Sequence, residues 1–147
     1  MKPEQYHILW TSSWIALFPC LLSIYFHQYG VTITTASVYT TSILYWRHPI
    51  DGWRKYLDES VVRIALIYQL YIAYYQHKIV IYSTINSLAI LIFYLGQQYY
   101  YKRGLLWHYT YCHFTLHLLG NLSNFYLLLP PYPGREAPLL YYPTQPS

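Results

Sequence analysis

Apolar residues fall into five long runs separated by short polar connections. The runs cover approximately residues 8–26, 31–46, 57–76, 79–95 and 104–129. A helix of about 20 predominantly apolar residues can cross the hydrocarbon core of a bilayer. The Thr- and Val-rich run 31–46 also has β propensity, but a lone strand in lipid would leave its backbone groups unsatisfied. The pattern therefore predicts an all-α fold, a polytopic transmembrane helical bundle of about five spans.

The chain divides into two predicted regions, a transmembrane helical bundle over residues 1–129 and a Pro-rich tail over residues 130–147. Pro130 and Pro131 cannot continue a helix, because proline lacks the backbone donor and clashes with the preceding turn. The tail holds six of the nine prolines of the chain. We expect it to be extended or disordered.

Composition agrees with a membrane protein. Of 147 residues, 55% are apolar and 10% are charged, against about 25% charged in typical soluble domains. The 21 tyrosines and five tryptophans belong to the residue types enriched at bilayer interfaces. The net charge is +4, but the basic residues are scattered among the connections, so no nucleic-acid partner is expected. The expected partner is the lipid bilayer.

The distribution of basic residues predicts the orientation in the membrane. Five crossings place the N-terminus and the second and fourth connections on one side. That side carries most of the basic residues: Lys2, Arg47, Arg54, Lys55, Lys102 and Arg103. The opposite side carries Lys78 and Arg135. Because short loops rich in Lys and Arg stay inside, we expect the N-terminus inside and the C-terminus outside.

A polar stripe runs along the fifth helix. His113, His117, Asn121 and Asn124 follow one another at intervals of four, four and three residues, which places them on one face. His108 is nine residues from His117 and lies on the opposite side. Two histidines at this spacing can ligate one zinc ion if further groups complete the tetrahedron. The alternative is that imidazoles and amides hydrogen-bond to neighbouring helices.

A second group of polar residues surrounds the connection between the second and third helices. Ser42 lies near the end of one helix, and Asp58 is expected at the start of the next, where the helix dipole favours a carboxylate. Glu59 and Arg63 are four residues apart, so they can form an ion pair on one face of the helix. Gln69 is eleven residues beyond Asp58 and returns to the same face. This spacing predicts a polar inner face on the third helix.

These residues resemble the pattern of the CREST superfamily, which includes alkaline ceramidases, progestin/adipoQ receptors and hemolysin III-like proteins. In that pattern a Ser near a helix end precedes an Asp near the next helix start, and H-x-x-x-H lies in the last helix. Ser42, Asp58, His113 and His117 fit these positions in order. The resemblance implies that the two histidines and a third bind zinc, while Asp58 and Ser42 arrange the water or the scissile amide.

The chain departs from that pattern at the third ligand. In the family pattern a His follows the Ser by four residues. In this chain that position holds Trp46, which cannot ligate zinc. His48 could take the place of that ligand only if the helix unwinds before Pro49. The missing ligand and the small size favour a noncatalytic scaffold or accessory subunit that uses its polar His/Asn seam to hold helices and joins other membrane subunits. The alternative is a zinc-dependent membrane hydrolase of lipid amides or esters, with zinc as cofactor and a lipid as substrate.

Overall fold

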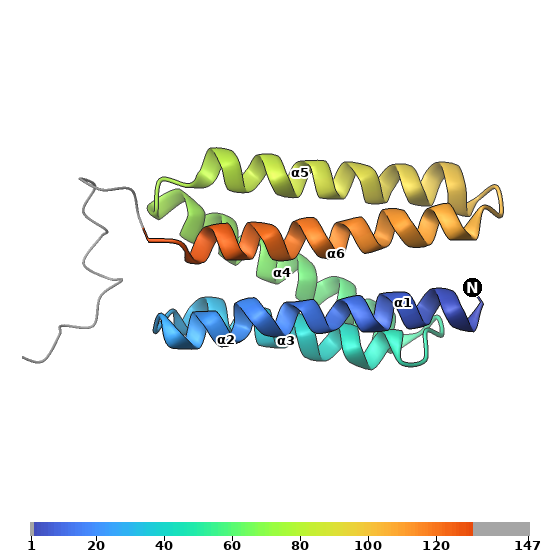
Figure 1. Ribbon diagram of the computed structural model, residues 1–147, viewed down its shortest axis with the longest axis horizontal. Coiled ribbons are helices and arrows are strands. Elements are labelled where there is room, and N and C mark those ends of the chain that lie inside the picture. Colours follow the sequence, from blue (N-terminus) through green and yellow to red (C-terminus); the bar gives the residue numbers. More distant parts are fainter. Residues whose placement is uncertain (1, 131–147) are drawn as a thin grey trace, which may run out of the picture.

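The computed structural model describes residues 2–130, and within that range the chain is helical with no strands (Figure 1). The elements are α1 (Pro3–Ser13), η1 (Trp14–Ala16), α2 (Leu17–Tyr25), α3 (Tyr29–Trp46), α4 (Trp53–Tyr75), α5 (Ile79–Leu95), η2 (Gly96–Tyr101) and α6 (Leu106–Leu128). Because α1, η1 and α2 are continuous and η2 extends α5, these elements form five rods. The predicted all-α fold is confirmed, while the predicted tail beyond Pro130 lies outside the described residues.

The first rod changes its winding just before a proline. Pro19 has no backbone donor, and its ring crowds the carbonyl four residues earlier, at Ile15. The 3₁₀ segment η1 spans Trp14–Ala16 and includes that carbonyl. A tighter turn at this point lets the helix pass the proline without ending. The rod therefore runs from Pro3 to Tyr25.

Three of the four connections between rods use the same helix-ending motif. Each has one residue in the left-handed region, at His27 (φ 54°), His77 (φ 57°) and Gly104 (φ 74°). After α2, the Gln28 N–H donates to the Ser23 carbonyl at 2.8 Å. The left-handed residue and this bond from the residue after it define a Schellman motif. These motifs reverse the chain within a few residues.

The rods are arranged so that α6 lies between α5 and the first rod, which in turn packs on α3. Helix α4 crosses the bundle obliquely, from α3 at one end towards α5 at the other (Figure 1). Its start at Trp53 is earlier than the sequence suggested, so Asp58 lies more than one turn inside the helix. The expected role of Asp58 as a charge at the helix N-terminus is therefore wrong.

The interior differs between the two halves of the bundle. In what we call the apolar half, the ends of α4 and α6 meet the starts of α3 and α5 around one cluster of buried residues: Val31, Ile72, Ala73, Tyr82, Leu127 and Leu128. This half also buries polar side chains, such as Gln69 and Lys78. The buried side chains of the other half, which we call the polar half, include Ser12, Ser42 and Asp58. The candidate site lies in the polar half.

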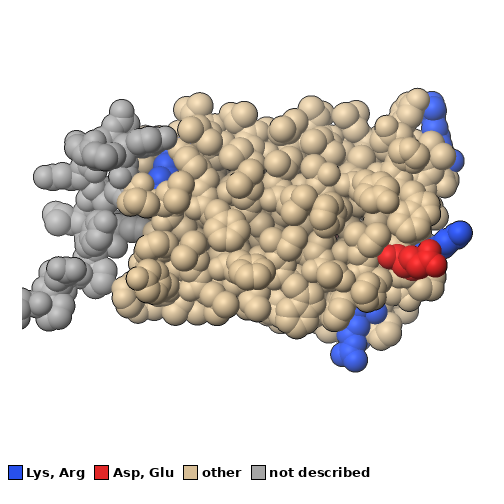
Figure 2. All heavy atoms as spheres, viewed as in Figure 1, with Lys and Arg blue, Asp and Glu red and all other residues tan. Residues whose placement is uncertain are grey.

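The outer surface is apolar along every rod. Phe18, Ile33, Ile67, Val80 and Leu122 represent the five rods, and they are between 54% and 73% exposed. Figure 2 shows that most charged side chains of the visible face gather towards one end, while basic surface is also visible near the other end. Two helices, Pro3–Tyr25 and Ile79–Tyr101, are long and apolar enough to span a membrane.

Candidate functional site

The first part of the candidate site is a carboxylate held between α3 and α4, which we call the acid cluster. Asp58 is buried, and its Oδ1 accepts hydrogen bonds from Ser42 Oγ at 2.7 Å and from Thr41 Oγ1 at 2.9 Å. Hydrogen bonds to an ionised group are shorter and stronger than neutral ones. The structure thus brings together Ser42 and Asp58, as the sequence suggested, and adds Thr41, which the sequence analysis missed.

The second part, which we call the histidine cluster, joins α6 to α1 and α3. His117 Nδ1 lies 2.7 Å from Ser12 Oγ. The His113 ring stands nearly perpendicular to the rings of His117, Trp46 and Phe93, with centroid separations of 5.1, 4.8 and 4.9 Å. Such edge-on packing is favourable between rings. Ring packing therefore fixes the position of His113.

The hydrogen bonds of Ser12 define which nitrogen of His117 carries the proton. The Ser12 hydroxyl has one proton and also lies 2.9 Å from the Leu9 carbonyl, which can only accept. When Ser12 donates to that carbonyl, His117 donates from Nδ1 to the hydroxyl oxygen. The other ring nitrogen, Nε2, is then the acceptor. When Ser12 instead donates to Nδ1, the proton of the neutral ring lies on Nε2.

The donor set of the histidine cluster does not match a catalytic zinc site. Such a site uses three protein ligands and keeps a fourth position for water. Trp46 occupies the position where the resemblance requires a histidine, and His48 lies exposed in the turn after α3. Among residues 2–130 no group of three or more His, Cys, Asp and Glu side chains is placed to hold a metal ion. The structure therefore brings His113 and His117 together without His48.

The polar seam continues into the apolar half through Gln69. Tyr82 donates its hydroxyl proton to Gln69 Oε1 at 2.8 Å, and Gln69 Nε2 donates to Thr34 Oγ1 at 3.2 Å. These two bonds connect α5, α4 and α3. The inward direction predicted for Gln69 is observed, whereas Tyr82 could not be singled out among 21 tyrosines.

The two asparagines of the stripe behave differently. Asn121 is buried, and its Nδ2 donates to the His117 carbonyl at 2.7 Å, one turn earlier in the same helix. Asn124 is partly buried, and its Oδ1 atom is buried with no hydrogen-bond partner. His108 is exposed and stacks on Tyr100 with ring centroids 5.0 Å apart, outside the stripe as expected.

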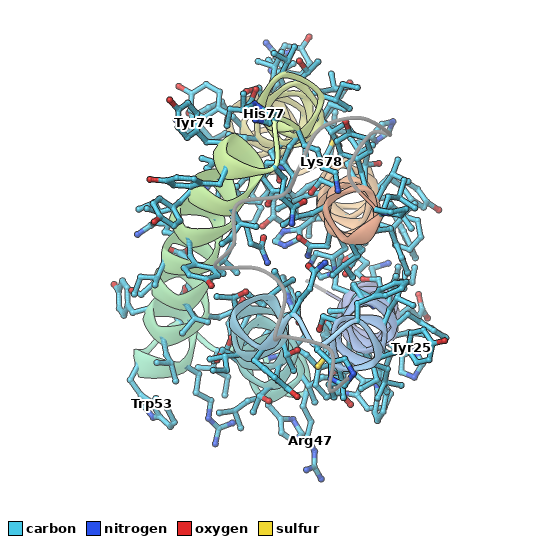
Figure 3. The ribbon with its side chains drawn as sticks, turned by 90° about the vertical axis from the view of Figure 1, so that its left-hand side faces the viewer. Tyr25, Arg47, Trp53, Tyr74, His77 and Lys78 are labelled. Atoms are coloured by element: carbon cyan, nitrogen blue, oxygen red, sulfur yellow. The ribbon has the colours of Figure 1, made fainter. Side chains whose placement is uncertain are left out.

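A buried lysine closes the apolar end of the bundle. Figure 3 shows Lys78 directed towards the end of α6, where its Nζ donates to the carbonyls of Leu127, at 2.9 Å, and Leu129. A cation at a helix C-terminus satisfies carbonyls that lack intrahelical partners. Burial lowers the pKa of Lys78 to about 8. No local residue pattern indicates this contact, because it depends on how α4, α5 and α6 meet.

The side chains of the candidate site connect several helices of the bundle. The acid cluster joins α3 to α4, and the histidine cluster joins α6 to α1 and α3. Gln69 adds α5 to the same set. No protein-family model, curated protein or solved structure was found to match this chain.

Proposed function

We propose that this protein is a multi-pass integral membrane protein whose five rods all cross the bilayer, with the N-terminus inside. The observation that carries this proposal is the inverted surface: large apolar side chains are exposed on every rod, while serines, an aspartate and glutamines are buried. Water-soluble monomers rarely expose such extensive apolar surface. In lipid the same surface is solvated, and polar groups turn inward to find partners.

Within the membrane, the proposed role is that of a noncatalytic scaffold or accessory subunit. Ser12, Ser42 and Gln69 make hydrogen bonds between different helices, so their contribution is to fix how the rods pack. Trp46 fills the space beside His113 with an indole instead of a metal ligand. Interhelical hydrogen bonds in membranes contribute about 0.6 kcal/mol on average, so several together are needed to hold one arrangement.

Membrane insertion and orientation can be tested together by cysteine labelling. In a Cys20→Ser, Cys112→Ser background, Ile50→Cys and Tyr29→Cys place single thiols at opposite ends of the bundle. We expect the protein to resist alkaline carbonate extraction. A membrane-impermeant maleimide should label Tyr29→Cys in intact cells and Ile50→Cys only after permeabilisation. Extraction by carbonate, or labelling of both positions in intact cells, would contradict the proposal.

A zinc-dependent lipid amide hydrolase related to the CREST superfamily is the second candidate. The Ser42–Asp58 hydrogen bond and the contact between the His113 and His117 rings favour it. For the scaffold we expect purified protein that is folded and free of stoichiometric metal. Zinc at one equivalent, lost on His113→Ala with His117→Ala, and hydrolysis of ceramide-like lipids, lost on Asp58→Ala, would favour the hydrolase instead.

Trp46 offers a sharper test of the relation between the two candidates. Trp46→His would supply a third imidazole beside His113, and Trp46→Phe is the matched control that removes the indole without adding a ligand. If the fold is a CREST fold that has lost one ligand, Trp46→His gains zinc binding and Trp46→Phe does not. Failure of folded Trp46→His protein to bind zinc would separate this chain from the superfamily.

A further inference from the structure

The outer surface of α4 carries an ion pair in the interior of the helix, away from both of its ends. Arg63 Nη2 lies 2.9 Å from Glu59 Oε2, and the two side chains are 70% and 42% exposed. The other charged residues among 2–130 lie at the ends of rods, or are buried like Asp58. Glu59 and Arg63 are thus the charged side chains that face outward between the two ends.

The depth of this pair makes lipid an unfavourable neighbour. Arg63 is ten residues beyond the first residue of α4, or about 15 Å along the helix axis. Glu59 is six residues beyond the same point, and the inclination of α4 makes the depth of both residues smaller than their distance along the axis. If the proposed membrane location is correct, the pair lies in the inner half of the hydrocarbon core, which is about 30 Å thick. Ionisable side chains at such depth usually face protein. The pair therefore indicates a protein neighbour on this face.

The residues around the pair form a continuous stripe suited to helix packing. Tyr56, Ser60, Arg63, Ile67 and Tyr74 are all exposed and follow intervals of four, three, four and seven residues. That spacing is the seam of a helix pair. Ser60 is the small residue within it, and small residues allow two membrane helices to approach closely. We call this stripe the α4 seam.

We propose that the α4 seam binds the same seam of a second copy of this chain. The pair is self-complementary, because one turn of helix presents both a carboxylate and a guanidinium. A partner helix with one sign of charge would leave the other unmatched. Two copies inserted in the same orientation are related by a two-fold axis along the membrane normal. Each Arg63 is then shared between its own Glu59 and the second copy's Glu59.

The oblique course of α4 limits how much of the seam makes contact. Figures 1 and 3 show α4 inclined to the other rods, so two copies related by this axis cross rather than run side by side. Contact is concentrated where they cross, and a small side chain is needed there. Ser60, beside the ion pair, meets that requirement. The two α4 helices therefore cross at Ser60, and Glu59 and Arg63 of both copies form the charge network beside the crossing point.

Disulfide cross-linking in native membranes tests the contact. In the Cys20→Ser, Cys112→Ser background, Ser60→Cys lies in the proposed seam, and Ser87→Cys is the control, an exposed serine on α5. We expect copper-phenanthroline oxidation to give about tenfold more dimer with Ser60→Cys, equivalent to about 1.4 kcal/mol. Equal yields for both positions in membrane-integrated protein would overturn the interface and leave the membrane location intact.

Charge reversal in trans distinguishes a second copy from another partner. Arg63→Glu alone and Glu59→Arg alone each create like charges on the seam, so each should lose the Ser60→Cys dimer. Co-expression of the two variants with different tags should restore a mixed dimer, because opposite charges then meet. Dimer yields that do not respond to either reversal, or mixed dimers that fail to form, would overturn pairing through Glu59 and Arg63.

Discussion

Buried side chains in the two halves of the bundle are held by different kinds of interaction. In the apolar half, Tyr82 and Leu127 have no exposed surface and pack in one cluster with four other residues. In the polar half, Asp58 is held by two hydroxyl groups and His113 by aromatic rings. The cluster around Tyr82 and Leu127 gains from close packing, while the acid cluster and the histidine cluster gain from specific partners.

Stability and specificity come from different interactions in these clusters. In a closely packed cluster, a substitution that removes side-chain volume leaves a cavity and lowers stability. A buried polar group penalises the loss of its partner, because the remaining group is left unsatisfied. Substitutions in the two halves should therefore respond to different properties: volume in one and hydrogen-bonding capacity in the other. Four changes test this contrast.

The largest effect is expected from Leu127→Ala in the apolar half. It removes a fully buried side chain from the cluster around Tyr82, and should lower the free energy of unfolding by about 2–4 kcal/mol. Leu122→Ala is the control, because Leu122 is exposed on the same helix, and we expect less than about 0.5 kcal/mol. Unfolding in mixed detergent micelles measures both. A similar loss for the two variants would remove the distinction.

The next effect concerns Lys78, the charged group of the apolar half. Its pKa of about 8 is below the value near 10.4 of an unfolded lysine, so the unfolded chain binds the proton more tightly. The free energy of unfolding should therefore rise between pH 8 and pH 10.4, by at most about 3 kcal/mol. Below pH 8 this contribution is constant.

Lys78→Met is the control for that pH dependence, because it keeps the aliphatic chain and removes the titrating group. Tyrosines also titrate at high pH, so the measured quantity is the difference between the two stability curves. That difference should increase between pH 8 and pH 10.4. A constant difference would mean that burial does not control the ionisation of Lys78.

The same Ser→Ala change can be made in each cluster of the polar half. Ser42 donates to a carboxylate, and such hydrogen bonds are stronger than neutral ones. Ser42→Ala should therefore cost about 1–1.7 kcal/mol, the upper end for interhelical hydrogen bonds in membranes. Ser12 pairs with an imidazole, and Ser12→Ala should cost about 0.6 kcal/mol, the average for such bonds. Thermal unfolding in micelles compares them. Equal costs would indicate that Asp58 is not ionised.

The smallest effect is expected at a turn of the apolar half. His77 has a φ of 57°, where a side chain is disfavoured and glycine is not. His77→Gly should therefore raise stability by about 0.5–1 kcal/mol. His108→Gly makes the same change in the first turn of α6 and should lower stability by about 0.3–0.5 kcal/mol. A loss at both positions would show that the His77 side chain has a role beyond its backbone conformation.

Much of the fold follows from periodicity, since five apolar runs became five rods. The inward direction of His117, Asn121 and Gln69 could also be predicted from the sequence, because the spacing of residues along a helix determines which face they share. Contacts between rods do not follow. Ser12 meets His117, and Trp46 meets His113, because α6 packs on α1 and lies near α3. No local pattern specifies which helices become neighbours.

The exact ends of the helices could also not be predicted from the apolar pattern. The start of α4 at Trp53 rather than Leu57, and the continuation of α5 through η2, both lie where polar and aromatic residues obscure the end of an apolar run. Gly96 allows η2 to approach α6, since a Cβ there would lie 2.5 Å from Cys112 Cβ. This close approach depends on tertiary packing, so the apolar pattern alone could not extend the helix.

The three Schellman motifs have a consequence for how the chain is made. Each reverses direction through bonds among neighbouring residues, so each helical hairpin can close as soon as its second helix leaves the ribosome. The connection 47–52 has no such motif and joins a two-rod unit to a three-rod unit. We expect the two units to insert independently and to assemble even when synthesised as separate chains, cut at Gly52.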